Sequence, residues 1–65
     1  MKLIDLNRTQ RTELAKKLGS SEPYIYQLAI GLRKGSPKFM QKINKADPRF
    51  KLSDLRPDIW GEHHD

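Results

Sequence analysis

The side chains best suited to chemistry in this sequence are cations, hydroxyls and amides in the middle of the chain. Gln27 carries an amide that donates and accepts hydrogen bonds together, which matches N6 and N7 of adenine. Arg33, Lys34 and Lys38 follow it, and Ser36 precedes a proline, an arrangement typical of a helix N-terminus that favours anions. These residues predict contact with a nucleic acid. The alternative is a solvated basic surface with a solvated amide.

The charge distribution favours the same partner. The 65 residues carry a net charge of +5, and residues 31–51 hold seven basic side chains against one acidic side chain. Residues 52–65 are net acidic. A concentrated basic block is expected for a protein that binds phosphate backbones, because each neutralised phosphate releases condensed counterions.

Composition argues against several other classes of protein. The chain has no cysteine, so no disulfide or thiolate metal site is expected. Its two histidines lie in the terminal stretch 62–65, EHHD, where adventitious metal binding is a better interpretation than a built site. No apolar run approaches the roughly 18 residues of a membrane helix, and no signal peptide is visible. We therefore expect a cytoplasmic protein that is not an enzyme and needs no cofactor.

Two helices joined by a short turn are predicted to position the central residues. Leu14, Ala15 and Leu18 form one apolar stripe after a possible cap at Asn7 or Thr9, and Gly19 ends that helix. A second helix over 21–30 starts at the Ser20-Ser21-Glu22-Pro23 segment and stops at Gly31. Its apolar face is predicted to comprise Ile25, Leu28, Ala29 and Leu32.

A third helix is predicted to follow the basic loop. Ser36 and Pro37 open it, Phe39, Met40, Ile43 and Ala46 are its apolar positions, and Asp47-Pro48 breaks it. The apolar residues of this helix, like Trp60, are expected to lie in the core. Residues 3–6 fit a short helix or a strand, 49–52 could form a strand, and 53–56 suggest one more capped turn or short helix.

These elements predict an all-α fold, a compact domain of four to five helices over residues 1–61. Residues 62–65 are expected to form a disordered tail. The order of Ala15, Gly19, Ile25 and Leu28 fits a helix-turn-helix, although a generic pair of antiparallel helices could imitate it.

Two segments resemble known regulators. Residues 12–28, TELAKKLGSSEPYIYQL, are similar to the helix-turn-helix of the lambda-repressor and Cro type. Residues 52–60, LSDLRPDIW, resemble the closing segment of YdaS-like and Cro-like phage or prophage regulators. The sequence departs from the usual pattern at Ser20, where an apolar residue is common.

The resemblance implies that the second helix enters the major groove of DNA. The base contacts would then come from the residues that face away from its apolar stripe: Ser21, Glu22, Pro23, Tyr26 and Gln27. Several of these have other interpretations, since Ser21 could serve as a helix cap, Glu22 could face the helix dipole and Tyr26 could pack on its neighbours. The predicted phosphate contacts are Arg11, Arg33, Lys34, Ser36 and Lys38.

The expected function is that of a sequence-specific transcription regulator, a Cro-like repressor bound as a homodimer to a palindromic operator in double-stranded DNA. Leu32, Ile59 and Trp60 are candidate dimer contacts, and Trp60 could equally fill the core. The alternatives are an antitoxin-like protein-interaction module and a non-specific nucleic-acid binder.

Overall fold

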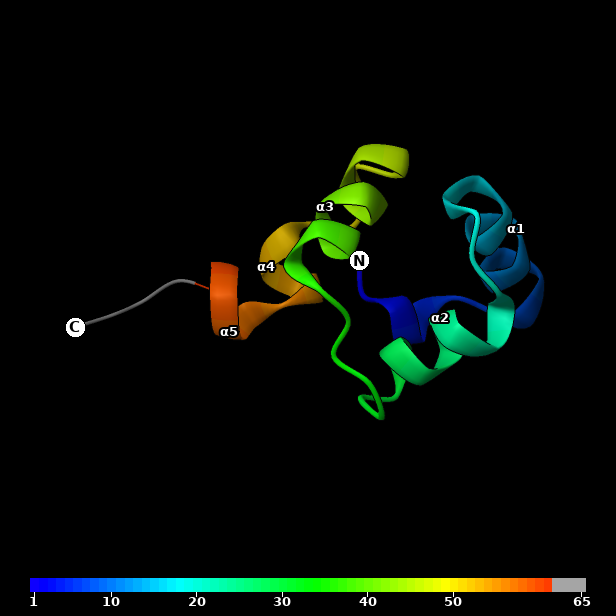
Figure 1. The fold of residues 1–65 in the computed structure, drawn as a ribbon, viewed down its shortest axis with the longest axis horizontal. Helices are drawn as coiled ribbons and strands as arrows, with labels where there is room; N and C mark the ends of the chain where they lie inside the picture. The colour runs from blue at the N-terminus through cyan, green and yellow to red at the C-terminus, as the bar shows by residue number, and fades with distance from the viewer. Residues whose placement is uncertain (62–65) are drawn as a thin grey trace.

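In a computed structural model, which describes residues 1–61, every regular element is helical (Figure 1). In chain order the elements are the 3-10 helix η1 (Leu3–Asp5) and the α-helices α1 (Arg8–Leu18), α2 (Glu22–Ala29), α3 (Pro37–Ala46), α4 (Leu52–Leu55) and α5 (Pro57–Trp60). The all-α prediction is confirmed. The strand considered for 49–52 is absent, because Phe50 N–H closes a turn on the carbonyl of Asp47 at 3.0 Å and α4 begins at Leu52.

The first long helix begins and ends as its terminal residues predict. Asn7 caps α1 in a reciprocal arrangement: its side chain accepts from Gln10 N–H at 2.8 Å, and its own N–H donates to the Gln10 side chain at 2.9 Å. Gly19 adopts a left-handed φ of +67°, which lets Ser20 N–H donate back to the Ala15 carbonyl at 2.8 Å. The cap is therefore Asn7 rather than Thr9.

The second helix is bounded by a serine and a left-handed glycine. Ser21 Oγ accepts from Tyr24 N–H at 3.4 Å, and Gly31 turns the chain at φ +80°. Leu32 N–H then donates to the Gln27 carbonyl at 2.9 Å. The predicted apolar face is wrong at Leu32, which is 68% exposed, because the left-handed turn at Gly31 directs the chain away from the helix axis.

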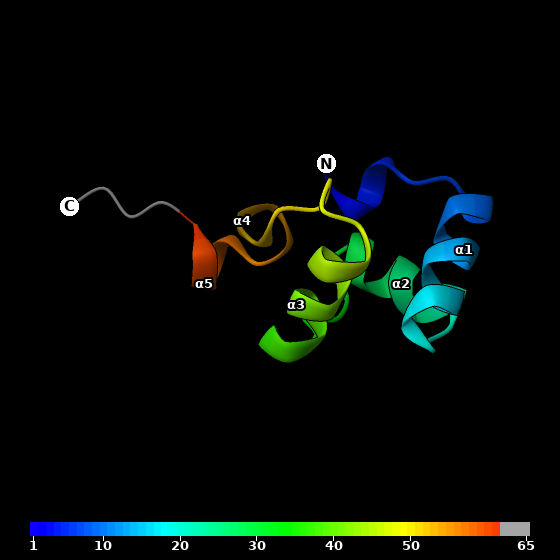
Figure 2. The ribbon, with the colours of Figure 1, turned by 90° about the horizontal axis from the view of Figure 1, so that it is seen from above.

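One core joins the N-terminal segment to the first three α-helices and the segment before α4. Its buried residues are Leu3, Leu6, Leu14, Ala15, Leu18, Ile25, Met40, Ile43 and Phe50. Helices α1, α2 and α3 all contribute to it. Helices α1 and α5 lie at opposite ends of the molecule in both views (Figures 1 and 2). Phe39 and Trp60, expected in the core, pack against it while remaining partly exposed, and Ile59 is 38% exposed.

Three glycines have left-handed φ angles, but only Gly35 is also crowded. A Cβ at Gly35 (φ +69°) would lie 2.8 Å from Met40 Cε and 3.0 Å from Leu28 Cδ2, whereas at Gly31 it would meet nothing within 4 Å. Both substitutions to alanine bring the cost of a left-handed backbone, roughly 1–2 kcal/mol. We expect Gly35→Ala to lower the free energy of unfolding more than Gly31→Ala, by up to about 1 kcal/mol, because the ends of the Met40 and Leu28 side chains must also move. Urea denaturation of the two variants measures this difference, and equal losses would contradict it.

Candidate nucleic-acid interface

The turn between α1 and α2 is bridged by a half-buried ion pair. Arg11 Nε donates to Glu22 Oε2 at 2.7 Å, and Arg11 Nη1 donates to the Leu6 carbonyl at 2.9 Å. The side chains of Arg11 and Glu22 are only 17% and 19% exposed. The guanidinium also lies over the Tyr26 ring, 5.0 Å from its centroid. Arg11 thus fixes the start of α2 against both α1 and the segment that precedes α1.

This pairing changes the interpretation of two predicted site residues. Arg11 was expected to contact phosphate and Glu22 was a candidate for base contact. In the structure the two side chains form an ion pair with each other. A glutamate near DNA phosphates is unfavourable, and the adjacent guanidinium compensates for its charge. The structure favours a positioning role for both residues.

The other predicted base contacts lie on the outer side of α2. Ser21 and Pro23 are exposed at its first turn, and Tyr26 is 44% exposed although one face of its ring covers Arg11. Gln27 is half-buried, and its Oε1 accepts from Arg33 Nε at 2.7 Å. The structure therefore brings Gln27 together with Arg33, which was predicted as a phosphate contact.

The basic loop that follows α2 ends at the capped start of α3. Arg33, Lys34, Ser36 and Lys38 are all exposed. Ser36 Oγ accepts from Phe39 N–H at 3.1 Å, so this serine caps α3, and Lys38 lies in the first turn of that helix. Exposed cations beside a helix N-terminus provide a surface that attracts phosphate.

The Leu55-Arg56-Pro57-Asp58 segment anchors this loop. Arg56 Nη1 donates to the Gly35 carbonyl at 2.6 Å, while its Nε and Nη2 bind Asp58 at 2.9 and 2.7 Å. The side chain of Arg56 is 14% exposed. The resemblance had singled out this segment, but nothing in the sequence indicated that its arginine would hold the loop between α2 and α3.

The same contact perturbs a carboxyl group. Hydrogen bonding to Arg56 lowers the pKa of Asp58 from 3.8 to about 2, and the charge of nearby Lys34 acts in the same direction. Because this pKa is lowered on folding, the contact contributes stability above about pH 4 and loses it as the pH falls toward 2. We expect an NMR titration of Asp58 to show this low value and Arg56→Met to return it to the ordinary range. An ordinary value in the unmodified protein would contradict the Arg56–Asp58 contact.

Two further side chains position the site and were missed by the sequence analysis. Lys42 donates through Nζ to the Leu18 carbonyl at the end of α1, 3.0 Å away. Tyr24 on α2 makes an edge-to-face contact with Phe39 on α3, with ring centroids 5.5 Å apart. No spacing rule could have found these contacts, because they join residues far apart in sequence.

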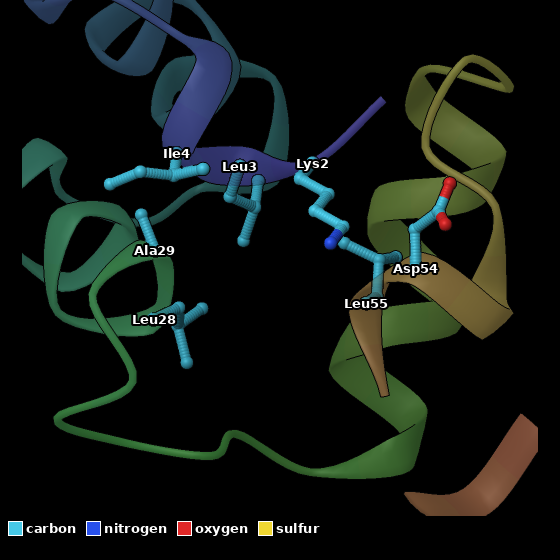
Figure 3. Close-up of a pocket in the computed structure, with 7 residues that line it drawn as sticks. All are labelled: Lys2, Leu3, Ile4, Leu28, Ala29, Asp54 and Leu55. Atoms are coloured by element: carbon cyan, nitrogen blue, oxygen red, sulfur yellow. The ribbon is translucent and has the colours of Figure 1, made fainter. Parts of the chain in front are cut away.

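A small hollow beside α2 is lined by Lys2, Leu3, Ile4, Leu28, Ala29, Asp54 and Leu55 (Figure 3). Its volume of about 110 Å³ is below the roughly 300–1,000 Å³ typical of small-molecule sites. Residues 1–61 contain no cluster of three or more potential metal ligands, and the 62–65 stretch considered for metal binding lies outside the described residues. In the described part of the chain, no helix is both long and apolar enough to cross a membrane.

No family model, curated protein or solved structure matches this chain.

Proposed function

We propose that this protein is a non-enzymatic, sequence-specific DNA-binding regulator of the lambda-repressor helix-turn-helix type. In this proposal α2 lies in the major groove, with Ser21, Pro23, Tyr26 and Gln27 toward the bases. Lys34, Ser36 and Lys38 contact the phosphate backbone beside it. Repression of transcription is the regulatory effect that the Cro-like resemblance favours.

The observation that carries this proposal is the continuity between the outer side of α2 and the exposed basic loop. Gln27 on the helix is hydrogen-bonded to Arg33 in the loop, and Arg56 fixes the far end of that loop through Gly35. Glu22, the one acidic residue of α2, is paired with Arg11. The surface thus combines side chains that can hydrogen-bond to base edges with exposed positive charge. A helix that binds in the major groove needs both.

A dimer fits this arrangement because a single helix offers few base contacts. Two copies would place their α2 helices in successive major grooves, about 34 Å apart on a palindromic site. Ile30 and Leu32, 48% and 68% exposed, follow directly on α2 and are the apolar residues that we assign to the contact between copies. Trp60 packs against the core, which makes it a weaker candidate.

The test is DNA binding at several salt concentrations, with sites selected from a random pool. We expect a palindromic site bound by two chains. Lys34→Ala should weaken binding to all sequences and reduce the slope of log affinity against log salt by about one for each chain, or about two for the dimer. Lys45→Ala is the matched control, because Lys45 is exposed in the last turn of α3, at the opposite end from Lys38, and should leave the slope unchanged.

Two results would refute this function. Absence of DNA binding at low salt would point instead to a protein-interaction module of the antitoxin-like kind. Binding that is equal for all sequences would indicate a non-specific nucleic-acid binder.

A further inference from the structure

Gln27 and Arg33 are held together by both backbone and side-chain bonds. The N–H groups of Leu32 and Arg33 donate to the backbone carbonyl of Gln27 at 2.9 and 3.3 Å. This arrangement returns the start of the loop to the last turns of α2. Arg33 Nε then donates to the side-chain Oε1 of Gln27 at 2.7 Å. The two side chains therefore form one unit.

The bond between them changes which hydrogen bonds the glutamine can offer. Bidentate contact with adenine requires Oε1 to accept from N6 while the amide nitrogen donates to N7. In this structure Oε1 accepts from Arg33 with one of its two lone pairs, so the two amide N–H groups of Gln27 outnumber the acceptor site that remains. The glutamine amide is thus biased toward partners that accept hydrogen bonds.

Arg33 also retains its donor fork. Its Nε is used by Gln27, but Nη1 and Nη2 make no hydrogen bond within residues 1–61, and none of the four ion pairs found there involves Arg33. The side chain is exposed beside α2. A guanidinium fork matches two adjacent acceptors, which in the major groove are O6 and N7 of guanine.

We propose that Gln27 and Arg33 act together to select guanine in the major groove. Arg33 donates from its fork to guanine O6 and N7, while Gln27 orients the guanidinium and donates its amide N–H to an acceptor of the neighbouring base. This inference rests on the proposed function and replaces two expectations from the sequence: adenine as the partner of Gln27 and phosphate as the partner of Arg33.

The first experiment compares sites selected from a random DNA pool by the unmodified protein, Arg33→Lys and Gln27→Ala. We expect guanine at one position of each half-site. Arg33→Lys keeps the charge but not the fork, so it should lower the preference for guanine about tenfold while leaving the salt slope unchanged. Gln27→Ala should also reduce that preference, because the guanidinium loses its support. Circular dichroism should show that both variants remain folded, since neither side chain belongs to the core.

The second experiment changes single atoms of the selected guanine. Replacement by 7-deazaguanine removes the N7 acceptor and should weaken binding of the unmodified protein more than binding of Arg33→Lys, which lacks the two-pronged guanidinium. Replacement by hypoxanthine keeps O6 and N7 and removes only the minor-groove amino group, so it should be tolerated.

The outcomes separate this inference from the function on which it rests. Two results would overturn the guanine assignment alone. One is selective DNA binding with adenine at that position, and the other is a guanine preference as strong in Arg33→Lys as in the unmodified protein. Arg33→Ala could instead lower the affinity for all sequences equally, with an unchanged base preference and a smaller salt slope. That result would indicate that Arg33 contacts phosphate and would also overturn the guanine assignment. Absence of DNA binding by the unmodified protein would overturn both proposals.

Discussion

Phe50→Ala is expected to lower the free energy of unfolding by about 3–5 kcal/mol, a large part of the stability of a domain this small. Phe50 is 1% exposed and is among the largest fully buried side chains within residues 1–61. Truncating a buried phenylalanine costs about 3–5 kcal/mol, whereas a domain of this length has a total stability of roughly 3–10 kcal/mol. The residue is also held from α3, since Asn44 Nδ2 donates to its carbonyl at 2.7 Å. The surrounding chain is therefore poorly placed to close the cavity.

Far-UV circular dichroism during urea denaturation measures this effect. Ile4→Ala is the control, because it also shortens an apolar side chain, but one that is 56% exposed and has no part in the proposed contact between copies. Its free energy of unfolding should change by less than about 0.5 kcal/mol. A Phe50→Ala variant as stable as this control would show that the core closes without Phe50 and would contradict the packing described above.

Arg11→Met is expected to destabilise the protein by about 2 kcal/mol and to weaken binding to a selected DNA site. Hydrogen bonds to charged groups contribute roughly 1.5–3 kcal/mol, and this substitution leaves both Glu22 and the Leu6 carbonyl without their donor. Because Glu22 is only 19% exposed, water replaces the lost guanidinium incompletely. The orientation of α2 should become less defined, which reduces affinity for the preferred site more than affinity for random DNA.

A double-mutant cycle isolates the ion pair. Glu22→Gln should cost less than Arg11→Met, and the double variant should recover about 1 kcal/mol relative to the sum of the single losses. The salt slope of DNA binding distinguishes the two roles considered for Arg11. A positioning residue leaves the slope unchanged, in contrast to Lys34→Ala. A slope reduced by about one for each chain in Arg11→Met would restore the phosphate contact expected from the sequence.

The helix boundaries were predictable because they depend on neighbours in the chain. Ser21 and Ser36 are caps that bind N–H groups three residues later, and Gly19 and Gly31 end helices by adopting positive φ angles. The apolar stripes at Leu14, Ala15 and Leu18 likewise follow from helical periodicity. The prediction was wrong at Leu32 because a stripe extrapolated through Gly31 ignores the change in chain direction there.

The roles of the site residues depended on contacts across the fold. Residue type alone suggested a phosphate contact for Arg11, but the approach of α2 to α1 pairs it with Glu22. Gln27 has the right chemistry for adenine as an isolated side chain, and only the return of the loop after Gly31 places Arg33 against its oxygen. DNA binding itself stays a prediction, supported by the continuity of α2 with the basic loop.

The helical fold, the caps and the concentration of positive charge after α2 follow from propensity, periodicity and charge, which are local properties of the chain. Contacts across the fold control which polar groups remain available. They pair Arg11 with Glu22, hold Gly35 through Arg56 and join Gln27 to Arg33. Each polar side chain has a fixed number of hydrogen-bond donors and acceptors. Those that bind a partner within the fold are no longer free to bind a ligand.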